Sequence, residues 1–139
     1  MEKVKVRYRT FQYNKLCRDK TVERSEKIGS KIHFTVLDDN DFDKNLRMKI
    51  KEEAEEVALA TSRDELITEL ADVLEVMQAL CTLHAVDFED VVTKQLSIRA
   101  ERGGFDGRIF ITKAEHQEGS WAEKYCAQHS DKYPEIFNI

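Results

Sequence analysis

The chain has 139 residues, of which 41% are hydrophobic and 35% charged, with a formal net charge of -5, five glycines and one proline. This composition excludes collagen-like chains, disorder rich in proline and glycine, and sandwiches of many short strands, which need more turn residues. The length suits a single domain, residues 1–139, and we expect a mainly α-helical, antiparallel bundle with a minor β element.

The first part of the chain is basic and mixes extended with helical patterns. Residues 4–10 alternate apolar and basic side chains, which favours a short strand or an ordered arm within residues 1–12. Residues 21–28 predict a two-turn helix, and residues 31–36 predict a second short strand.

Two long amphipathic helices should follow and form an antiparallel hairpin. Residues 41–60 contain no glycine or proline and repeat apolar residues at helical spacing. The segment from Ser62 to Glu65 is a capping box that begins a second helix, whose apolar positions run from Leu66 to Leu80.

After the hairpin, residues 88–102 predict a third helix that Gly103 and Gly104 end, and residues 108–112 predict a closing strand. We interpret residues 113–139 as a helical extension that docks on the domain or on a second subunit. This extension carries large rings that are costly to leave in water, namely Trp121, Tyr125, Tyr133 and Phe137.

Carboxylates lie on the apolar faces of both hairpin helices. At about 100° per residue, Glu53 falls on the apolar arc of the first helix and Glu56 at its edge, and Glu69 and Asp72 repeat the pattern on the second. One such pair is ordinarily interpreted as acids on the flank of a helix that reach solvent. Two facing pairs repel each other and are costly to bury, so they need a compensating cation. Carboxylate oxygens without His or Cys favour Mg2+, or Mn2+, over Zn2+, and an open Mg2+ site indicates phosphate chemistry.

The same acids form a spaced double motif. Glu52-Glu53-Ala54-Glu55-Glu56, followed after twelve residues by Glu69-Leu70-Ala71-Asp72, resembles the E-E-x-x-E and E-x-x-D signature of the MazG-like, all-α nucleoside triphosphate pyrophosphohydrolases. Residues 13–20, Y-N-K-L-C-R-D-K, and residues 102–105, R-G-G-F, resemble a phosphoribosyl-ATP pyrophosphohydrolase-like branch, with cysteine where valine is usual. The resemblance covers a core of residues 13–112.

The resemblance implies a homodimer or homotetramer that hydrolyses a nucleoside triphosphate to the monophosphate and pyrophosphate, in nucleotide-pool housekeeping. It implies that the catalytic residues, which also hold Mg2+, are Glu53, Glu56, Glu69 and Asp72. Glu52 belongs to the motif, but its direction on the helix leaves its role open. Predicted substrate ligands in the matched segments are Asn14, for base or sugar, and, for phosphates, Lys15, Arg18, Lys20, Arg99 and Arg102. Because the metal-free quartet should strain the fold, Asp72→Asn is expected to melt at or above wild type without metal.

Two alternatives stay open. The chain could be phosphoribosyl-ATP pyrophosphohydrolase itself, which shares these motifs and the bond chemistry. It could also be a non-catalytic helical module that binds a Mg-nucleotide, or a protein partner through residues 121–137.

Nucleic acid and membrane are not expected as partners. Residues 38–90 carry sixteen acidic side chains against five basic ones, which disfavours nucleic-acid binding. No apolar run is long enough to cross a bilayer, and the first residues lack the apolar core of a signal peptide. Widely spaced Cys17, Cys81 and Cys126 predict reduced thiols, so we expect a cytoplasmic protein.

Overall fold

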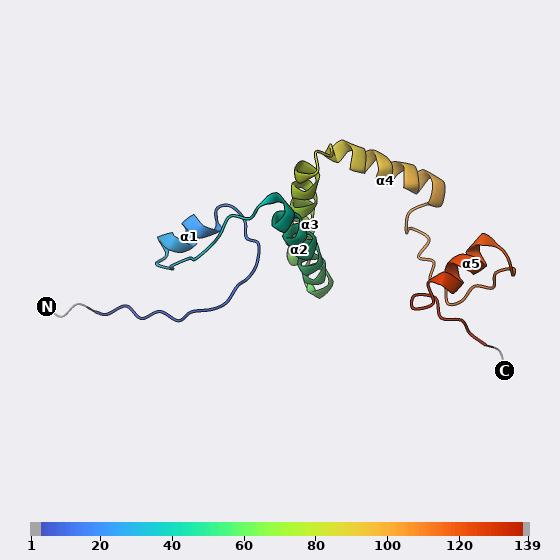
Figure 1. The fold of residues 1–139 in the computed structure, drawn as a ribbon, viewed down its shortest axis with the longest axis horizontal. Coiled ribbons are helices and arrows are strands. Elements are labelled where there is room, and N and C mark those ends of the chain that lie inside the picture. Colours follow the sequence, from blue (N-terminus) through green and yellow to red (C-terminus); the bar gives the residue numbers. More distant parts are fainter. Residues whose placement is uncertain (1–3, 138–139) are drawn as a thin grey trace. The chain divides into compact units, whose positions relative to one another are not determined.

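A computed structural model describes residues 4–137, and within that range it contains helices and no strand (Figure 1). The fold class is therefore mainly α, as predicted. The helices are α1 (Thr21–Lys27), α2 (Asp39–Leu59), α3 (Arg63–Leu83), α4 (Phe88–Arg102) and α5 (Trp121–Gln128). Contacts divide the chain into two compact units, Met1–Ser97 and Ile98–Ile139. The organisation into one domain with an arm, a core and an extension stays a prediction.

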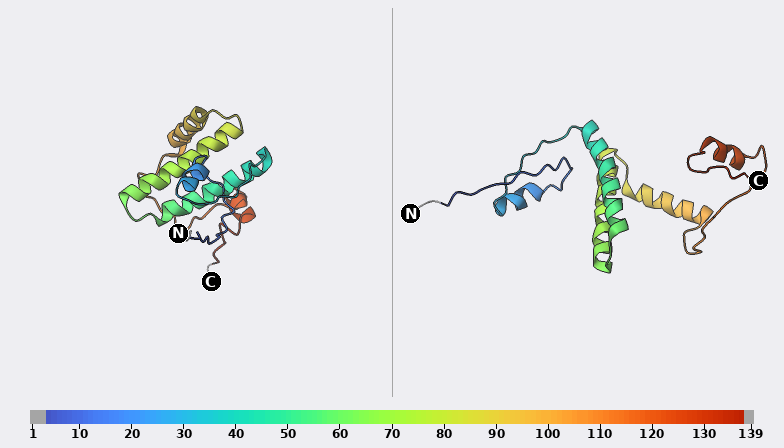
Figure 2. Two further views of the ribbon diagram at one scale, coloured as in Figure 1. Left: turned by 90° about the vertical axis from the view of Figure 1, so that its left-hand side faces the viewer. Right: turned by 90° about the horizontal axis from the view of Figure 1, so that it is seen from below.

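The first unit is built around the predicted hairpin of α2 and α3, which lie side by side in Figures 1 and 2. Helix α2 begins after Asp38, whose carboxylate accepts the N–H of Asp41 at 2.8 Å. Helix α3 begins after Ser62, whose hydroxyl accepts the N–H of Glu65 at 3.1 Å. The Ser62 half of the capping box is confirmed, whereas the Glu65 carboxylate accepts the N–H of Thr61, the residue before the cap, at 2.9 Å.

The hairpin has a small core of its own. Among the described residues, the buried apolar side chains are Leu46 on α2 and Val76 on α3, and both lie on the arcs that the helical angles predict. A second apolar strip on α3 consists of four residues that are each 40% to 54% exposed, namely Leu66, Ile67, Leu70 and Leu74. Apolar surface of this extent is typical of a helix that packs against a further layer.

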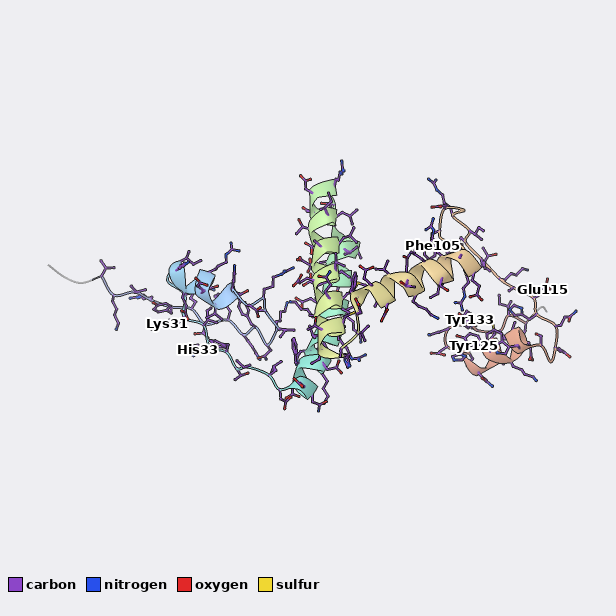
Figure 3. The ribbon with its side chains drawn as sticks, turned by 90° about the horizontal axis from the view of Figure 1, so that it is seen from above. Lys31, His33, Phe105, Glu115, Tyr125 and Tyr133 are labelled. Carbon is purple, nitrogen blue, oxygen red and sulfur yellow. The ribbon has the colours of Figure 1, made fainter. Side chains whose placement is uncertain are left out.

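The strands predicted at residues 31–36 and 108–112 are wrong, and of the strand or arm predicted for residues 4–10 the strand is wrong. Residues 4–10, 31–36 and 108–112 form no strand in the part of the chain that the structure describes. Alternation of side chains gives a strand only where a neighbouring segment completes the backbone hydrogen bonds. The first two segments meet instead through side chains, with the Lys31 Nζ 4.5 Å from the centre of the Tyr8 ring (Lys31 is labelled in Figure 3).

Left-handed glycines follow two helices, and for the helix at residues 88–102 this was predicted. Helix α1 is followed by Gly29 at φ +94°, and α4 ends at Arg102, before Gly103 at φ +85°. Both conformations are left-handed and disfavour residues with a Cβ atom.

Within the described residues of the extension, 113–137, the structure contains one helix, α5, which belongs to the second unit. The Ser120 hydroxyl accepts the N–H of Glu123 and begins the helix. The Trp121 and Tyr125 rings stack with centres 5.1 Å apart. The centre of the Tyr133 ring lies 6.0 Å from that of Tyr125, and both tyrosines are labelled in Figure 3. Docking of this extension stays a prediction.

The cysteines and the helix lengths relate to the environment expected for the chain. The three cysteines are free. Cys17, the position at which the motif resembled by residues 13–20 usually has valine, is exposed and is therefore not a core residue. Within the described residues, no helix combines the length and apolar character needed to cross a membrane.

Candidate active site

Three carboxylates from the two hairpin helices converge. Glu53 on α2 and Glu69 and Asp72 on α3 each offer one oxygen, and these oxygens lie within 4.8 Å of one another. The i,i+3 spacing places Glu69 and Asp72 on one face of α3, and the hairpin brings that face against Glu53. All three residues are half-buried. This trio is an oxygen-only donor set, which fits a hard divalent cation.

Glu56, the fourth predicted ligand, lies outside the trio. It follows Glu53 by three residues on α2 and is exposed. Its charge nevertheless contributes to the raised pKa of Glu69. The structure therefore brings three of the four acids together, and direct ligation by Glu56 stays a prediction.

Glu69 is the acid whose charge is least favoured. Its partial burial raises the pKa of its carboxyl above the ordinary 4.5, and the neighbouring charges of Asp72, Glu56 and Glu53 raise this pKa further. Among the described residues, no lysine, arginine or histidine forms an ion pair with Glu69. A bound cation would remove this unfavourable charge density.

Glu52 holds two lysines. Its Oε1 accepts a hydrogen bond from the Lys15 Nζ at 3.0 Å, and its Oε2 accepts one from the Lys49 Nζ at 3.1 Å. The bond from Lys15, opposed in part by burial and supported by Lys49, lowers the pKa of the Glu52 carboxyl. The first acid of the motif, whose role the sequence leaves open, is therefore a partner for cations in this structure.

Sequence reasoning missed Lys49. Its Nζ also lies 3.6 Å from an oxygen of Glu53, so it links the trio to Glu52. The available signal was local: Lys49 precedes Glu52 by three residues and Glu53 by four, the two spacings at which side chains meet on a helix.

Arg18 is the predicted phosphate ligand that lies at the trio. Its Nη2 donates to the Oδ1 of Asp72 at 2.7 Å. Together with the bond from Lys15 to Glu52, this ion pair joins residues 15–18 to both α2 and α3. We call residues 15–18 the strap.

The other predicted substrate ligands are not brought to the trio by any hydrogen bond or ion pair within the described residues. Asn14 is exposed at φ +46°, and Lys20 precedes α1. Arg99 and Arg102 lie in the last turn of α4, in the second unit, where Arg99 donates to Asp106 at 3.2 Å. Their contact with substrate stays a prediction.

The raised pKa of Glu69 predicts how the stability of the metal-free protein depends on pH. Folded Glu69 keeps a proton that the unfolded chain releases near pH 4.5, so its contribution to stability falls as the pH rises from there through the folded pKa. With EDTA present, lowering the pH from about 7 to about 5 should therefore raise the melting temperature.

Three other carboxyls act in the opposite direction at lower pH. Hydrogen bonds from His84, Lys15 and Thr61 lower the pKa values of Asp43, Glu52 and Glu65 respectively. Their stabilising contributions are present above the ordinary values of 3.8 and 4.5 and are lost as the pH falls through the folded values. Scanning fluorimetry should show a maximum at mildly acid pH, and a melting temperature that only falls on acidification would contradict this prediction.

A family model described as phosphoribosyl-ATP pyrophosphohydrolase matches residues 15–95, which is more than half of the chain. The matched stretch contains the strap, all of α1, α2 and α3, and the carboxylate trio. Neither the curated proteins nor the solved structures contain a match to this chain.

Proposed function

Because the chain belongs to the phosphoribosyl-ATP pyrophosphohydrolase family, within the MazG-like all-α superfamily, we propose that it hydrolyses a nucleoside triphosphate to the monophosphate and pyrophosphate. Members of this family are pyrophosphohydrolases, so the chain is a hydrolase of phosphorus-containing anhydrides that acts on nucleotide-like substrates. The observation that carries the proposal is the convergence of Glu53, Glu69 and Asp72 within 4.8 Å.

The acidic trio and the strap have complementary roles in this proposal. Glu53, Glu69 and Asp72 would hold Mg2+, or Mn2+, because their oxygens match the preference of hard cations. When bound, the metal would polarise a phosphate group and favour attack by water. Lys15 and Arg18 come from the same strap and would neutralise the charge of the leaving pyrophosphate. Glu56 is exposed beside the trio and is available to orient the attacking water.

Phosphoribosyl-ATP is a second candidate substrate, favoured by the description of the matching family. It would use the same trio and strap, since the bond that breaks is again the one that releases pyrophosphate. The base and the sugar distinguish the two substrates, and Asn14, adjacent to Lys15 in the chain, is the predicted ligand for either group.

A substrate panel tests the activity and the substrate together. Ribo- and deoxyribonucleoside triphosphates and phosphoribosyl-ATP are incubated with the protein and Mg2+, and pyrophosphate and orthophosphate are measured separately. We expect pyrophosphate without orthophosphate, and a loss of at least about a hundredfold in rate with EDTA. Orthophosphate as the product, or a rate that EDTA leaves unchanged, would contradict the proposal, and turnover of phosphoribosyl-ATP alone would select the second candidate.

We also propose that the protein is a homodimer or homotetramer. The exposed strip on α3 supports this assembly, because Leu66, Ile67, Leu70 and Leu74 lie beside the arc that packs on α2. A second hairpin laid on that strip would complete a helical bundle and bury the strip, whereas the hairpin alone buries few side chains.

A further inference from the structure

Asp72, one carboxylate of the trio, is already paired with an arginine from outside the hairpin. The Arg18 guanidinium donates to the Oδ1 of Asp72 at 2.7 Å, the shorter of the two bonds that hold the strap. Asp72 supplies one of the three converging oxygens of the trio. The positive charge of Arg18 therefore lies where a divalent cation would be attracted.

Arg18 differs from the other cation beside the trio. Lys49 belongs to α2, the helix that also carries Glu53, and its side chain is 21% exposed. Arg18 belongs to no helix, and its side chain is 60% exposed. Both side chains can leave their carboxylates by rotation, but Arg18 is the more exposed of the two and belongs to a segment outside the helices, so its release also frees that segment.

We propose that Arg18 is a built-in counter-ion of Asp72, which a divalent cation displaces when it binds the trio. The inference rests on the proposed function, since it requires the trio to bind a metal. A guanidinium and a divalent cation on the same carboxylate repel each other, so the two compete for Asp72. Molecules in which Arg18 is bound to Asp72 are less able to bind metal. The larger the fraction of such molecules, the lower the apparent affinity for metal.

The strap would stay attached while Arg18 is released. Lys15 is bound to Glu52, which is not one of the converging acids and is also held by Lys49. Release of Arg18 therefore frees one end of the strap and leaves its guanidinium beside the metal, where the phosphates of a substrate would bind. Arg18 is therefore a positioning residue, because it would be bound to Asp72 without metal and free to bind phosphate when the metal is present.

Titration of the full chain with Mn2+ by calorimetry, without nucleotide, tests the competition. We expect Arg18→Gln to bind Mn2+ roughly three- to tenfold more tightly than wild type, and Arg18→Lys to lie closer to wild type. The matched control is Arg24→Gln, which removes the same charge from α1, where Arg24 forms no ion pair within the described residues. This control should change the affinity by less than about twofold.

Amide exchange in wild type gives a second measurement that needs no variant. Mn2+ should increase exchange at residues 15–18, and an unchanged strap would overturn the proposal. The proposal is also overturned if Arg18→Gln binds Mn2+ no more tightly than wild type. The same holds if its affinity for Mn2+ increases no more than that of Arg24→Gln. If wild type binds no Mn2+, or Asp72→Asn binds as well as wild type, the metal site itself is wrong and the inference is lost with it.

Discussion

Glu69→Gln is expected to lower the rate of pyrophosphate release by at least about a hundredfold and to raise the melting temperature of the metal-free protein. The amide keeps the shape of the side chain but removes a charge that the metal needs. The same charge is unfavourable without metal, because Glu69 is partly buried beside Asp72, Glu56 and Glu53 and its pKa is raised. A steady-state assay and a thermal melt in EDTA measure the two effects.

The matched control for this variant is Glu55→Gln, which makes the same chemical change at an exposed position of α2. It should leave both the rate and the melting temperature nearly unchanged. Near-normal turnover in Glu69→Gln would remove Glu69 from the site. A lower melting temperature in EDTA would show that its carboxylate accepts a stabilising bond.

The structure changes the corresponding expectation for Asp72→Asn. The sequence alone predicts that this variant melts at or above wild type without metal, because it relieves repulsion. Asp72 also accepts the bond from Arg18 at 2.7 Å, so the substitution removes an attraction together with the repulsion. Glu69→Gln is therefore the cleaner test of strain in the trio.

Leu70→Glu is expected to separate the assembly into monomers, with an increase of at least about a hundredfold in its dissociation constant. Leu70 is 50% exposed within the apolar strip of α3. Burial of that strip against a second copy would place the new carboxylate in an apolar interface without a partner. Light scattering across a concentration series measures the change against the protomer mass of 16.2 kDa.

Met48→Glu is the control for assembly. Met48 is an exposed apolar residue on α2, about half a turn of the helix away from buried Leu46, so it lies outside the proposed interface. This variant should retain the mass of wild type. A wild-type mass of 16.2 kDa at micromolar concentration, or equal masses for Leu70→Glu and wild type, would contradict the assembly.

Features that depend on neighbours in the chain could be predicted from the sequence. The third helix extends from Phe88 to Arg102 as predicted, because caps, apolar spacing and a left-handed glycine act within one or two turns. The same periodicity placed Glu53 on the apolar arc of the first helix, which is the helix on which the structure buries Leu46. Helical angles on two adjacent helices were thus sufficient to predict that acids of α2 and α3 would face one another.

Contacts between distant segments were decided only by the tertiary structure. Arg18 and Asp72 are 54 residues apart, and Lys15 and Glu52 are 37 apart, so no helical or strand period relates them. The missing strands have the same origin, because the strand propensity of residues 31–36 favours an extended backbone but does not specify a segment that would pair with it. Local spacing determines which face a side chain occupies, whereas its partner is selected by packing of the whole chain.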